Sequence, residues 1–393
     1  MLTVTHNYPR FPGDPAGAFV ARIAEGAVRR GHEVEVVAPH APGSATQDQV
    51  GGVRLRRFRY GPEMLERVAY TGTLHGRTLA SPLAALGFPG FVWAFGHAVR
   101  TSIERFRPDV VHAHWWIPGG WFGSRGATPC VITCHGSDVR LLERGSLVRR
   151  FAQPVFRKAA RITTVSNFLA QDLRRLLPGI ETPILVTPMP VDAREFLAGS
   201  AVSKIDPPRI LYAGNLVASK GVDLLLHAAA ELDRRGIAWQ LKVVGEGPAR
   251  PGLETLASRL GIASKVTWSS FVPQTQMAAE YGASTVTALP SRGQAEGLGL
   301  TLVEALLAGC AVVGSGAGGI PEVVQHERTG LIARDGDPVD LATQIQRLLT
   351  DPALRNRLTR AGREHVLRHY SPDAAVGRFL EIYDAVADHQ PNR

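Results

Sequence analysis

The feature that most constrains the fold is a regular alternation of short β-branched segments with amphipathic helical patterns. Segments of the first kind include HEVEVVA, DVVHAHW and CVITCHG in the first half of the chain, and RILYAG, WQLKVVG and CAVVGS in the second. Strands that alternate with helices form parallel sheets that are covered by helices on both faces. The pattern therefore predicts an α/β protein made of two doubly wound units.

The length and one irregular stretch divide this pattern into two domains. A chain of 393 residues favours two domains, since a domain usually has about 100 to 200 residues. The stretch LAGSAVSKIDPP lacks periodicity and ends in two prolines that exclude a helix, so it is the predicted linker. After it, Ser371 as N-cap and Pro372 in the first turn predict a terminal helix, which we expect to pack back on the first domain. The predicted parts are an N-terminal domain over 1–196, a linker over 197–208, a C-terminal domain over 209–370 and the terminal segment 371–393.

Composition and the N-terminus narrow the class of protein. Hydrophobic residues make up 45% of the chain and charged residues 20%, as in soluble globular proteins. The start, LTVTHNYP after Met1, lacks the features of a signal peptide, and three cysteines, an odd number, argue against a disulfide framework. We therefore expect a cytoplasmic protein. The apolar stretch 80–99 contains two prolines and three glycines, which indicates core or interface and not a membrane span.

The basic charge predicts an anionic partner. The formal net charge is +9, which suits a nucleotide, a nucleic acid or an anionic membrane surface. Residues 143–162 carry six Lys or Arg against one acid, interleaved with apolar residues, so a helix here would be basic and amphipathic. Such a helix fits peripheral contact with anionic lipid, and a solvated face packed on the sheet explains it equally well. No nucleic-acid-binding fold or stacking aromatics are visible, so nucleic acid is not expected.

Residues that follow the predicted strands are the candidate ligand contacts, because ligands of open α/β sheets bind outside the carboxyl ends of the strands. Asn215 and Lys220 follow the strand RILYAG on a turn before a helix, where an anion such as phosphate is favoured. Glu296 and Glu304 lie in AEGLGLTLVEALLAG, the first in a glycine-rich loop and the second one turn inside a helix. Each carboxylate could hold two neighbouring hydroxyls of a sugar or ribose. A solvated lysine and two surface glutamates remain the plainer alternative.

Together these segments resemble the family 4 (group 1) glycosyltransferases, whose two-domain architecture is called GT-B. The resemblance covers nearly the whole chain and is specific because its motifs occur in order. The motifs are YPRFPGDPAGAFV, RRGHEVEVVAP, PDVVHAHW, TCHGSD and TTVSN in the first half, and YAGNLVASKGVDLLL, VVGEGP, the segment from FVPQ to PEVV, and TGLIARDGDP in the second.

The resemblance implies roles for residues of the C-terminal domain. Glu296 is expected to contact hydroxyls of the donor sugar, and Glu304 to hold the nucleotide ribose. Lys220 matches the diphosphate-binding lysine, whereas Asn215 stands where the family has an arginine, so neutralisation of the diphosphate leans on Lys220 and backbone N–H groups. The backbone of Val272 is expected to read the base. The backbone that approaches the diphosphate and sugar is that of Gly297, Leu298, Gly299, Leu300 and the following GAGG.

The resemblance extends to the N-terminal domain. His135 in TCHGSD matches the histidine that contacts the donor sugar and helps to stabilise charge. Gly13 and Gly17 are only approximate matches to the paired glycines of the family.

The function implied is that of a retaining glycosyltransferase. It would move a hexose-type sugar from a nucleotide-diphosphate sugar to a polysaccharide or lipid-linked acceptor on the cytoplasmic side of a bacterial membrane, without metal or cofactor. Two glutamates that grip sugar and ribose cannot both flank one glycosidic bond, as the usual retaining route requires. We therefore expect a front-face displacement, in which the leaving diphosphate assists deprotonation of the acceptor and Lys220 stabilises the developing charge.

Three other functions fit parts of the sequence. GSGAGG at 314–319 satisfies the dinucleotide-binding pattern G-x-G-x-x-G, with Asp335 at about the ribose-binding distance, so an NAD-dependent oxidoreductase is one alternative. A nucleotide-sugar epimerase of the same architecture is the second. The third is an inactive sugar-nucleotide-binding protein, which the Asn215 departure alone supports.

Two further groups resemble metal sites. Asp335 and Asp337 form a D-x-D pattern, but they lie in a DGDP sequence typical of turns, and we interpret them as a loop. His112 and His114 share one face of a strand and could be grouped with His135. We expect histidines of the inter-domain cleft rather than metal ligands, because no acid or cysteine has matching spacing.

Overall fold

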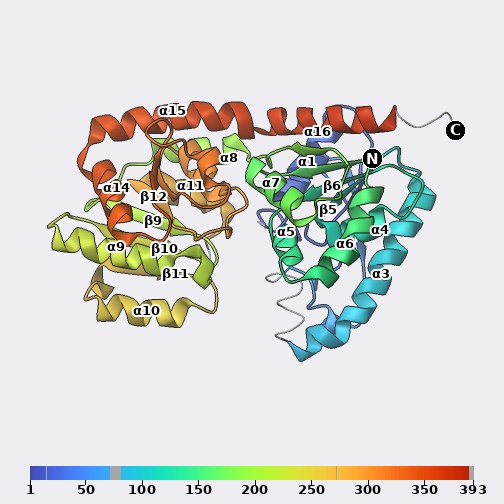
Figure 1. Cartoon of the computed structure of the whole chain (residues 1–393), viewed down its shortest axis with the longest axis horizontal. Coiled ribbons are helices and arrows are strands. Elements are labelled where there is room, and N and C mark those ends of the chain that lie inside the picture. The colour runs from blue at the N-terminus through green and yellow to red at the C-terminus, as the bar shows by residue number, and fades with distance from the viewer. Residues whose placement is uncertain (15, 71–80, 271, 389–393) are drawn as a thin grey trace. The chain divides into compact units, whose positions relative to one another are not determined.

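The computed structural model of the chain describes residues 1–14, 16–70, 81–270 and 272–388 (Figure 1). The chain divides into two compact units, each with its own sheet. Unit 1 contains residues 1–190 and 372–393, and unit 2 contains residues 191–371. Unit 1 is therefore assembled from two separate parts of the sequence.

The sheet of unit 1 has the strand order β3-β4-β2-β1-β5-β6-β7-β8, and the central strands are parallel. Strands β1, β2, β5 and β6 are buried throughout, which suits their apolar sequences because a parallel sheet is covered on both faces. The strands are β1 (Leu2–Val4), β2 (Glu35–Pro39), β3 (Gln47–Val50), β4 (Val53–Phe58), β5 (Val111–His114), β6 (Cys130–Cys134), β7 (Arg161–Thr164) and β8 (Ile184–Val186). The helices are α1 (Ala18–Val28), α3 (Pro82–Phe106), α4 (Trp121–Gly123), α5 (Ser137–Leu142), α6 (Ser146–Lys158), α7 (Asn167–Leu176) and α16 (Pro372–Ala387), with short helical turns η1 (Glu63–Leu65) and η2 (Trp115–Gly120).

The sheet of unit 2 has the order β11-β10-β9-β12-β13-β14, with parallel neighbours. The doubly wound α/β prediction is confirmed for both units. The strands are β9 (Arg209–Ala213), β10 (Gln240–Val244), β11 (Val266–Ser269), β12 (Val286–Leu289), β13 (Ala311–Ser315) and β14 (Leu331–Ala333). The helices are α8 (Ala193–Leu197), α9 (Val222–Arg234), α10 (Arg250–Arg259), α11 (Gln274–Ala283), α12 (Leu300–Leu307), α13 (Ile320–Val323), α14 (Pro338–Thr350) and α15 (Pro352–Tyr370), with turns η3 (Ala198–Ala201), η4 (Ala218–Lys220) and η5 (Ala263–Lys265).

The chain reverses its winding direction once in each sheet. In unit 1 the reversal lies between β1 and β5, and in unit 2 it lies between β9 and β12. The loops at the carboxyl ends of two such strands leave in opposite directions, so a ligand can lie between them. Lys220 follows β9 and Glu296 follows β12, so both lie at the reversal point of unit 2.

The predicted linker is instead part of unit 2. Residues 191–208, including 191–196 that we assigned to the first domain, contain α8 and η3 and belong to unit 2. The Lys204 ammonium donates to the carbonyls of Ser284 and Gly309 at 2.8 and 3.0 Å, and Ile205 N–H donates to Ala283 O at 3.0 Å. The absence of helical periodicity indicated irregular backbone, but irregular backbone can be tied down by hydrogen bonds to neighbouring elements.

The terminal helix α16 packs on unit 1. Its Tyr383 hydroxyl lies 2.7 Å from His112 Nδ1 in β5. A Cβ at Gly26 of α1 would lie 2.5 Å from a Val376 methyl carbon, so the two helices are in close contact there. Of the predicted segment 371–393, residues 389–393 lie outside the described residues.

Helix α3 covers most of the apolar stretch that we expected to be core or interface. Pro82 occupies the first turn and Pro89 lies inside the helix. Among the described residues, α3 is the helix whose length and composition would allow it to cross a membrane. Phe91 and Phe95 are buried, whereas Leu86 and Trp93 are 68% and 72% exposed, so the helix has one core face and one apolar outer face. Ala80, at the start of the apolar stretch, lies outside the described residues.

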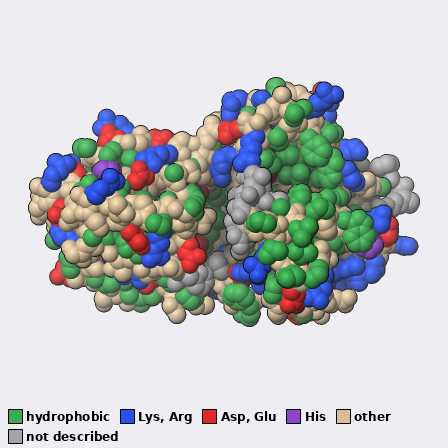
Figure 2. Space-filling view, turned by 90° about the horizontal axis from the view of Figure 1, so that it is seen from below, with side chains coloured by type: hydrophobic (Ala, Val, Ile, Leu, Met, Phe, Trp, Pro, Cys, Tyr) green, Lys and Arg blue, Asp and Glu red, His purple; other side chains and the backbone are tan. Residues whose placement is uncertain are grey.

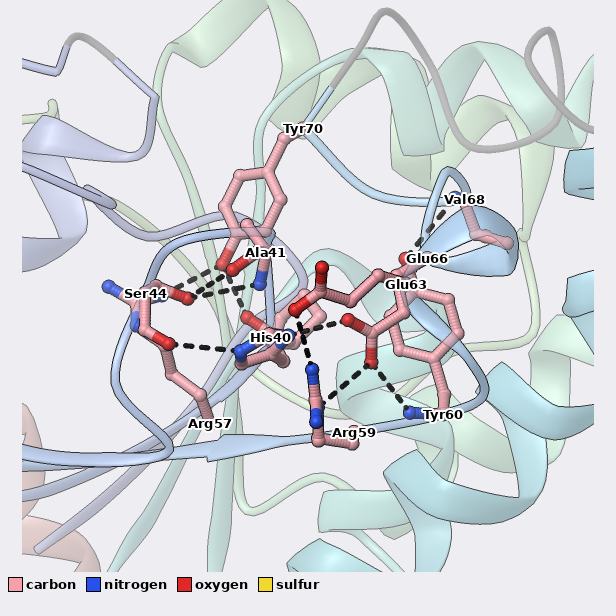
Figure 3. Close-up of polar contacts among 11 residues, drawn as sticks. His40, Ala41, Ser44, Arg57, Arg59, Tyr60, Glu63, Glu66, Val68 and Tyr70 are labelled. Carbon is pink, nitrogen blue, oxygen red and sulfur yellow. Dashed lines mark hydrogen bonds and ion pairs between the residues drawn. The ribbon is translucent and has the colours of Figure 1, made fainter.

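A buried ion pair fixes the loop after β2 (Figure 3). His40 Nδ1 lies 2.5 Å from Glu66 Oε2, and His40 Nε2 lies 2.9 Å from the Ser44 carbonyl oxygen. A carbonyl only accepts, so Nε2 carries a proton, and the histidine and glutamate share a second proton. The Ser44 hydroxyl donates to Ala41 O, so this trio is not a nucleophilic triad. Its role is to hold the loops after β2 and β4 together.

Candidate active site

The ends of β9 and β12 bring a lysine and a glutamate together in unit 2. Lys220 closes the turn after β9, and Glu296 lies in the loop after β12. Gly221 allows these loops to approach, because its φ is +69° and a Cβ there would lie 2.0 Å from the Pro290 carbonyl oxygen. Lys220 Nζ lies 2.5 Å from Glu296 Oε2, with both side chains mostly buried. The two residues to which the sequence analysis gave separate roles are thus ion-paired.

Glycines bring the backbone of the Glu296 loop against the loop after β13. A Cβ at Gly318 would lie 2.2 Å from the Glu296 carbonyl oxygen, and the Gly319 N–H donates to the same oxygen at 2.9 Å. Gly299, with φ +88°, then begins α12, whose first-turn N–H groups lack helical partners. Gly297 and Leu298 of the loop are buried, and Leu300, the first residue of α12, is half-buried. Backbone donors therefore lie beside the ion pair.

Glu304 lies on α12, on a different element from Glu296. It is half-buried, whereas Leu302 and Leu306 on the other side of the helix are fully buried. The Tyr281 hydroxyl donates to Glu304 Oε2 at 2.8 Å. Burial raises the pKa of Tyr281 well above its usual value, so the phenol remains a donor. Tyr281 was not among the predicted site residues, because a single tyrosine in the helix before β12 carries no local signal of this contact.

Arg292, a second cation at this edge, is paired with a carboxylate. Arg292 donates to both carboxylate oxygens of Asp223, at 2.8 and 2.6 Å. Asn215 is exposed after β9, and its carbonyl accepts from the Tyr212 hydroxyl at 2.9 Å. The sequence analysis missed the Arg292–Asp223 pair, because its members are far apart in the sequence.

The remaining candidates of unit 2 lie in loops and in one short helix. Asp335 accepts from the Gly293 N–H at 2.8 Å, and Asp337 caps α14, so both occupy the predicted loop. The GSGAGG segment leads into α13, a helix of only four residues. Val272 is half-buried after β11, and the neighbouring Phe271 lies outside the described residues. Within the described residues, no three His, Cys, Asp or Glu side chains are grouped to hold a metal ion.

In unit 1, His135 is held at the carboxyl end of β6. Asp138 Oδ1 accepts the backbone N–H of both His135 and Gly136, at 3.0 Å each. The ring packs on Trp115 and Phe19, with centroid distances of 4.3 and 5.0 Å. Burial lowers the pKa of His135 well below its usual value, so the imidazole is neutral at pH 7.

Trp115 is a site residue that the sequence analysis missed. It follows β5, packs against His6 in a tilted arrangement with a centroid distance of 4.2 Å, and has φ +64°. Positive φ is uncommon for a bulky residue, and such strain collects at functional sites. The sequence HAHW does not reveal the positive φ of Trp115, because backbone strain is set by tertiary packing.

The prediction that His112 and His114 line a cleft between domains is wrong. Both are fully buried within unit 1. His112 contacts Thr133 Oγ1 and the Tyr383 hydroxyl at 2.7 Å each, and His114 Nδ1 lies 3.0 Å from His135 Nε2. Their alternation with Ala113 placed them on one face of the strand, but both faces of this sheet are covered.

The two N-terminal glycines differ in setting. Gly17 begins α1 with φ +68°, and a Cβ there would lie 2.2 Å from the Asn7 carbonyl oxygen, so only glycine fits. Gly13 is exposed, and nothing lies within 4 Å of a Cβ there. Gly17 therefore brings α1 against the loop after β1, whereas Gly13 has no such role.

Two family models match consecutive parts of the chain. "Glycosyltransferase Family 4" matches residues 16–195, and "Glycosyl transferases group 1" matches residues 194–365. A D-inositol 3-phosphate glycosyltransferase of Streptomyces avermitilis is 30% identical over 334 residues, which cover 77% of this chain and 71% of that protein. The chain belongs to the group 1 glycosyltransferases. This glycosyltransferase resembles another protein named D-inositol 3-phosphate glycosyltransferase, from Xylanimonas cellulosilytica, at 29% identity over 97% of this chain and 94% of that one.

Solved structures show the fold of this glycosyltransferase to be GT-B. Sucrose-phosphate synthase of Thermosynechococcus elongatus superposes with a TM-score of 0.79 at 22% identity, covering 99% of each chain. HepE of Anabaena, solved with UDP and glucose, has a TM-score of 0.71 at 17% identity and covers 98% of this chain and 99% of that one. The family models and the relative of 30% identity give the enzyme class, glycosyl transfer, and leave the oxidoreductase alternative without a basis.

Proposed function

We propose that this glycosyltransferase moves a hexose from a nucleotide-diphosphate sugar to a saccharide or lipid-linked acceptor, with retention at the anomeric carbon. The observation that carries the proposal is the Lys220–Glu296 pair at the reversal point between β9 and β12, beside the N-terminus of α12. An ammonium with three donors and a carboxylate with four acceptor sites can bind phosphate and sugar hydroxyls respectively. HepE, whose structure holds UDP and glucose, supports a donor of this kind.

Each residue has a role in the proposal. Lys220 and the first N–H groups of α12 bind the diphosphate, Glu296 holds sugar hydroxyls, and Glu304, steadied by Tyr281, holds the ribose. His135 contacts the sugar as a neutral imidazole, so it adds no positive charge near a cationic transition state. The reaction needs no metal or cofactor in this proposal, because Lys220 and backbone donors stabilise the leaving diphosphate.

The partners of the two glutamates support front-face displacement. A double-displacement enzyme would place a nucleophilic carboxylate about 5 Å from the general acid. Glu296 is instead paired with Lys220, and Glu304 lies on α12 with Tyr281 as a partner. The diphosphate oxygen released on the same face of the sugar then accepts the proton of the acceptor hydroxyl.

The proposal is tested by thermal shift with UDP, GDP, ADP, TDP, their hexose conjugates and NAD. We expect one nucleoside diphosphate family to raise the melting temperature, and the matching sugar nucleotide to release diphosphate with an acceptor. Acceptors to screen include D-inositol 3-phosphate, after the named relatives, and polyprenyl-linked sugars. Absence of stabilisation by every nucleotide would exclude the donor site, NAD alone would restore the oxidoreductase, and conversion of the sugar nucleotide without an acceptor would indicate an epimerase.

Asn215→Arg is expected to tighten binding of the nucleoside diphosphate about tenfold. Lys220 and Arg292 are each paired with a carboxylate, so an added guanidinium would raise the net positive charge that the diphosphate meets. A charge-assisted bond contributes about 1.5 kcal/mol or more. Isothermal titration should show the gain for Asn215→Arg and not for the neutral control Asn215→Gln. Equal affinity of both variants would place residue 215 away from the diphosphate.

We also propose that unit 1 docks on an anionic membrane from the cytoplasmic side, as a lipid-linked acceptor requires. The docking surface, here called the apolar ridge, runs from α3 over α4 to α6. Figure 2 shows hydrophobic side chains gathered on the α3 side of unit 1, with Lys and Arg at its margins. Phe151 of α6 stacks on Trp121 of α4 at 4.1 Å, and Arg125 lies 4.4 Å from the Trp121 ring. The ridge comprises Leu86, Trp93, Trp121, Leu147 and Phe151, with Arg125, Arg149 and Arg150 beside it.

Leu147→Asp is expected to lower binding to phosphatidylglycerol vesicles at least about tenfold, because Leu147 is 81% exposed and would bury its side chain in the interface. Vesicle co-sedimentation measures the effect. Val339→Asp, at an exposed position of unit 2, is the matched control and should bind as the unmodified protein does. Binding of all three proteins to phosphatidylcholine alone, or to neither vesicle, would contradict the proposal.

A further inference from the structure

A hydrogen bond between two histidines decides how His135 presents its ring. His114 Nδ1 and His135 Nε2 are 3.0 Å apart. Burial lowers the pKa of both residues well below the usual value, so each ring carries one proton. One nitrogen of the pair must therefore donate and the other accept. Among the described residues, His135 Nδ1 has no hydrogen-bond partner, so it is the ring nitrogen that a ligand can reach.

The surroundings of His114 select between the two arrangements. If His135 donated, His114 would carry its proton on Nε2, and that N–H would be fully buried without an acceptor, because His114 Nε2 has no partner among the described residues. Buried N–H groups without partners are rare and cost about 1–3 kcal/mol. If His114 donates from Nδ1, its Nε2 carries only a lone pair that accepts no hydrogen bond. Buried acceptors without a partner are more common than buried N–H groups without one.

We infer that His114 is a positioning residue that fixes His135 in the Nδ1–H tautomer, so that His135 meets its ligand as a neutral hydrogen-bond donor. The inference rests on the proposed function in one respect, namely that the ligand of His135 is the donor sugar. The Nδ1–H then donates to a sugar hydroxyl oxygen and cannot accept a proton from it. His135 thus orients the sugar and does not act as the base of the reaction.

The tautomer is measured directly by long-range proton–nitrogen NMR of protein labelled with ¹⁵N-histidine at pH 7. The His135 signals are assigned by their loss in His135→Gln. We expect the pattern of an Nδ1–H imidazole for His135. An Nε2–H pattern in the unmodified protein would overturn the inference. This readout needs no substrate, so it stands even if the enzyme uses a different donor from the one proposed.

Variants of His114 separate positioning from packing. His114→Phe removes the donor and keeps the ring volume, so His135 should shift toward the Nε2–H tautomer and kcat should fall about tenfold, with the donor KM changed less than about threefold. His114→Asn offers an amide N–H near the place of Nδ1 and should retain the Nδ1–H tautomer and most of kcat.

His112→Asn is the matched control, because His112 is equally buried on β5 but bonds to Thr133 and Tyr383 instead of His135. It should lower stability and leave the His135 tautomer unchanged. An unchanged tautomer in His114→Phe would show that another group orients His135. A loss of the tautomer in all three variants would show that packing alone sets it. Either result would overturn the role of His114.

Discussion

Glu296→Gln is expected to lower kcat about 10² to 10³-fold while the affinity for nucleoside diphosphate stays the same or rises. The loss in kcat follows if Glu296 holds the sugar in the transition state, since one preorganised hydrogen-bonding group is worth about that factor. The affinity should not fall, because the change releases the Lys220 ammonium, 2.5 Å away, for the diphosphate. Steady-state kinetics and titration with the nucleoside diphosphate measure the two effects separately.

The variant Glu304→Gln should have the opposite effects, a lower affinity for the nucleotide and a nearly unchanged kcat. Loss of a ribose contact weakens nucleotide binding about tenfold and leaves kcat at saturating donor within about threefold. Tyr281→Phe is its control, because it removes only the hydrogen bond to Glu304 and should have a smaller effect of the same kind. If both glutamine variants lost kcat and affinity in equal measure, the assignment of Glu296 to the sugar and Glu304 to the ribose would be wrong.

Glu66→Ala is expected to destabilise unit 1 by about 3–5 kcal/mol, a fall in melting temperature of roughly 10 °C. The glutamate side chain is fully buried against His40, and its other oxygen accepts the Tyr60 N–H at 3.2 Å. Removing it leaves the Tyr60 N–H and the His40 Nδ1 without their partner. Calorimetry measures the shift.

Two neighbouring changes sharpen this stability test. Glu66→Gln should cost far less, because its amide can donate to His40 Nδ1 and still accept from Tyr60. Glu63→Ala should shift the melting temperature by about 1 °C or less, because Glu63 is 58% exposed and pairs with Arg59 at the surface (Figure 3). A similar loss for all three variants would show that the buried pair does not hold this loop.

The fold was predictable because buried parallel strands leave uninterrupted apolar runs in the sequence. The strand ending at Ala213, the loop position of Glu296 and the helical position of Glu304 could be read in the same way, since each depends on neighbours in the sequence. Contacts between side chains that are far apart in the sequence could not be predicted. Lys220 and Glu296 are 76 residues apart, and Tyr281 and Glu304 are 23 apart on different helices.

The predicted linker and the region of α3 were hard to interpret for a different reason. Pro207 and Pro208 indicate irregular backbone, but nothing local reveals that Lys204 is tied to the carbonyls of Ser284 and Gly309. Pro89 lies inside α3, which continues past it because helix packing on the sheet outweighs one missing N–H donor. In both places tertiary contacts decided what local sequence left open.

The return of the last helix to unit 1 has a consequence for synthesis. Domains generally fold as units while the chain emerges from the ribosome, the N-terminal one first. Here α16 supplies the Tyr383 partner of His112 and covers Gly26 of α1, so unit 1 cannot be completed until α16 has left the exit tunnel. Unit 2 is continuous and has all its residues earlier. Unit 2 follows residues 1–190 in the chain, yet it can finish folding before unit 1.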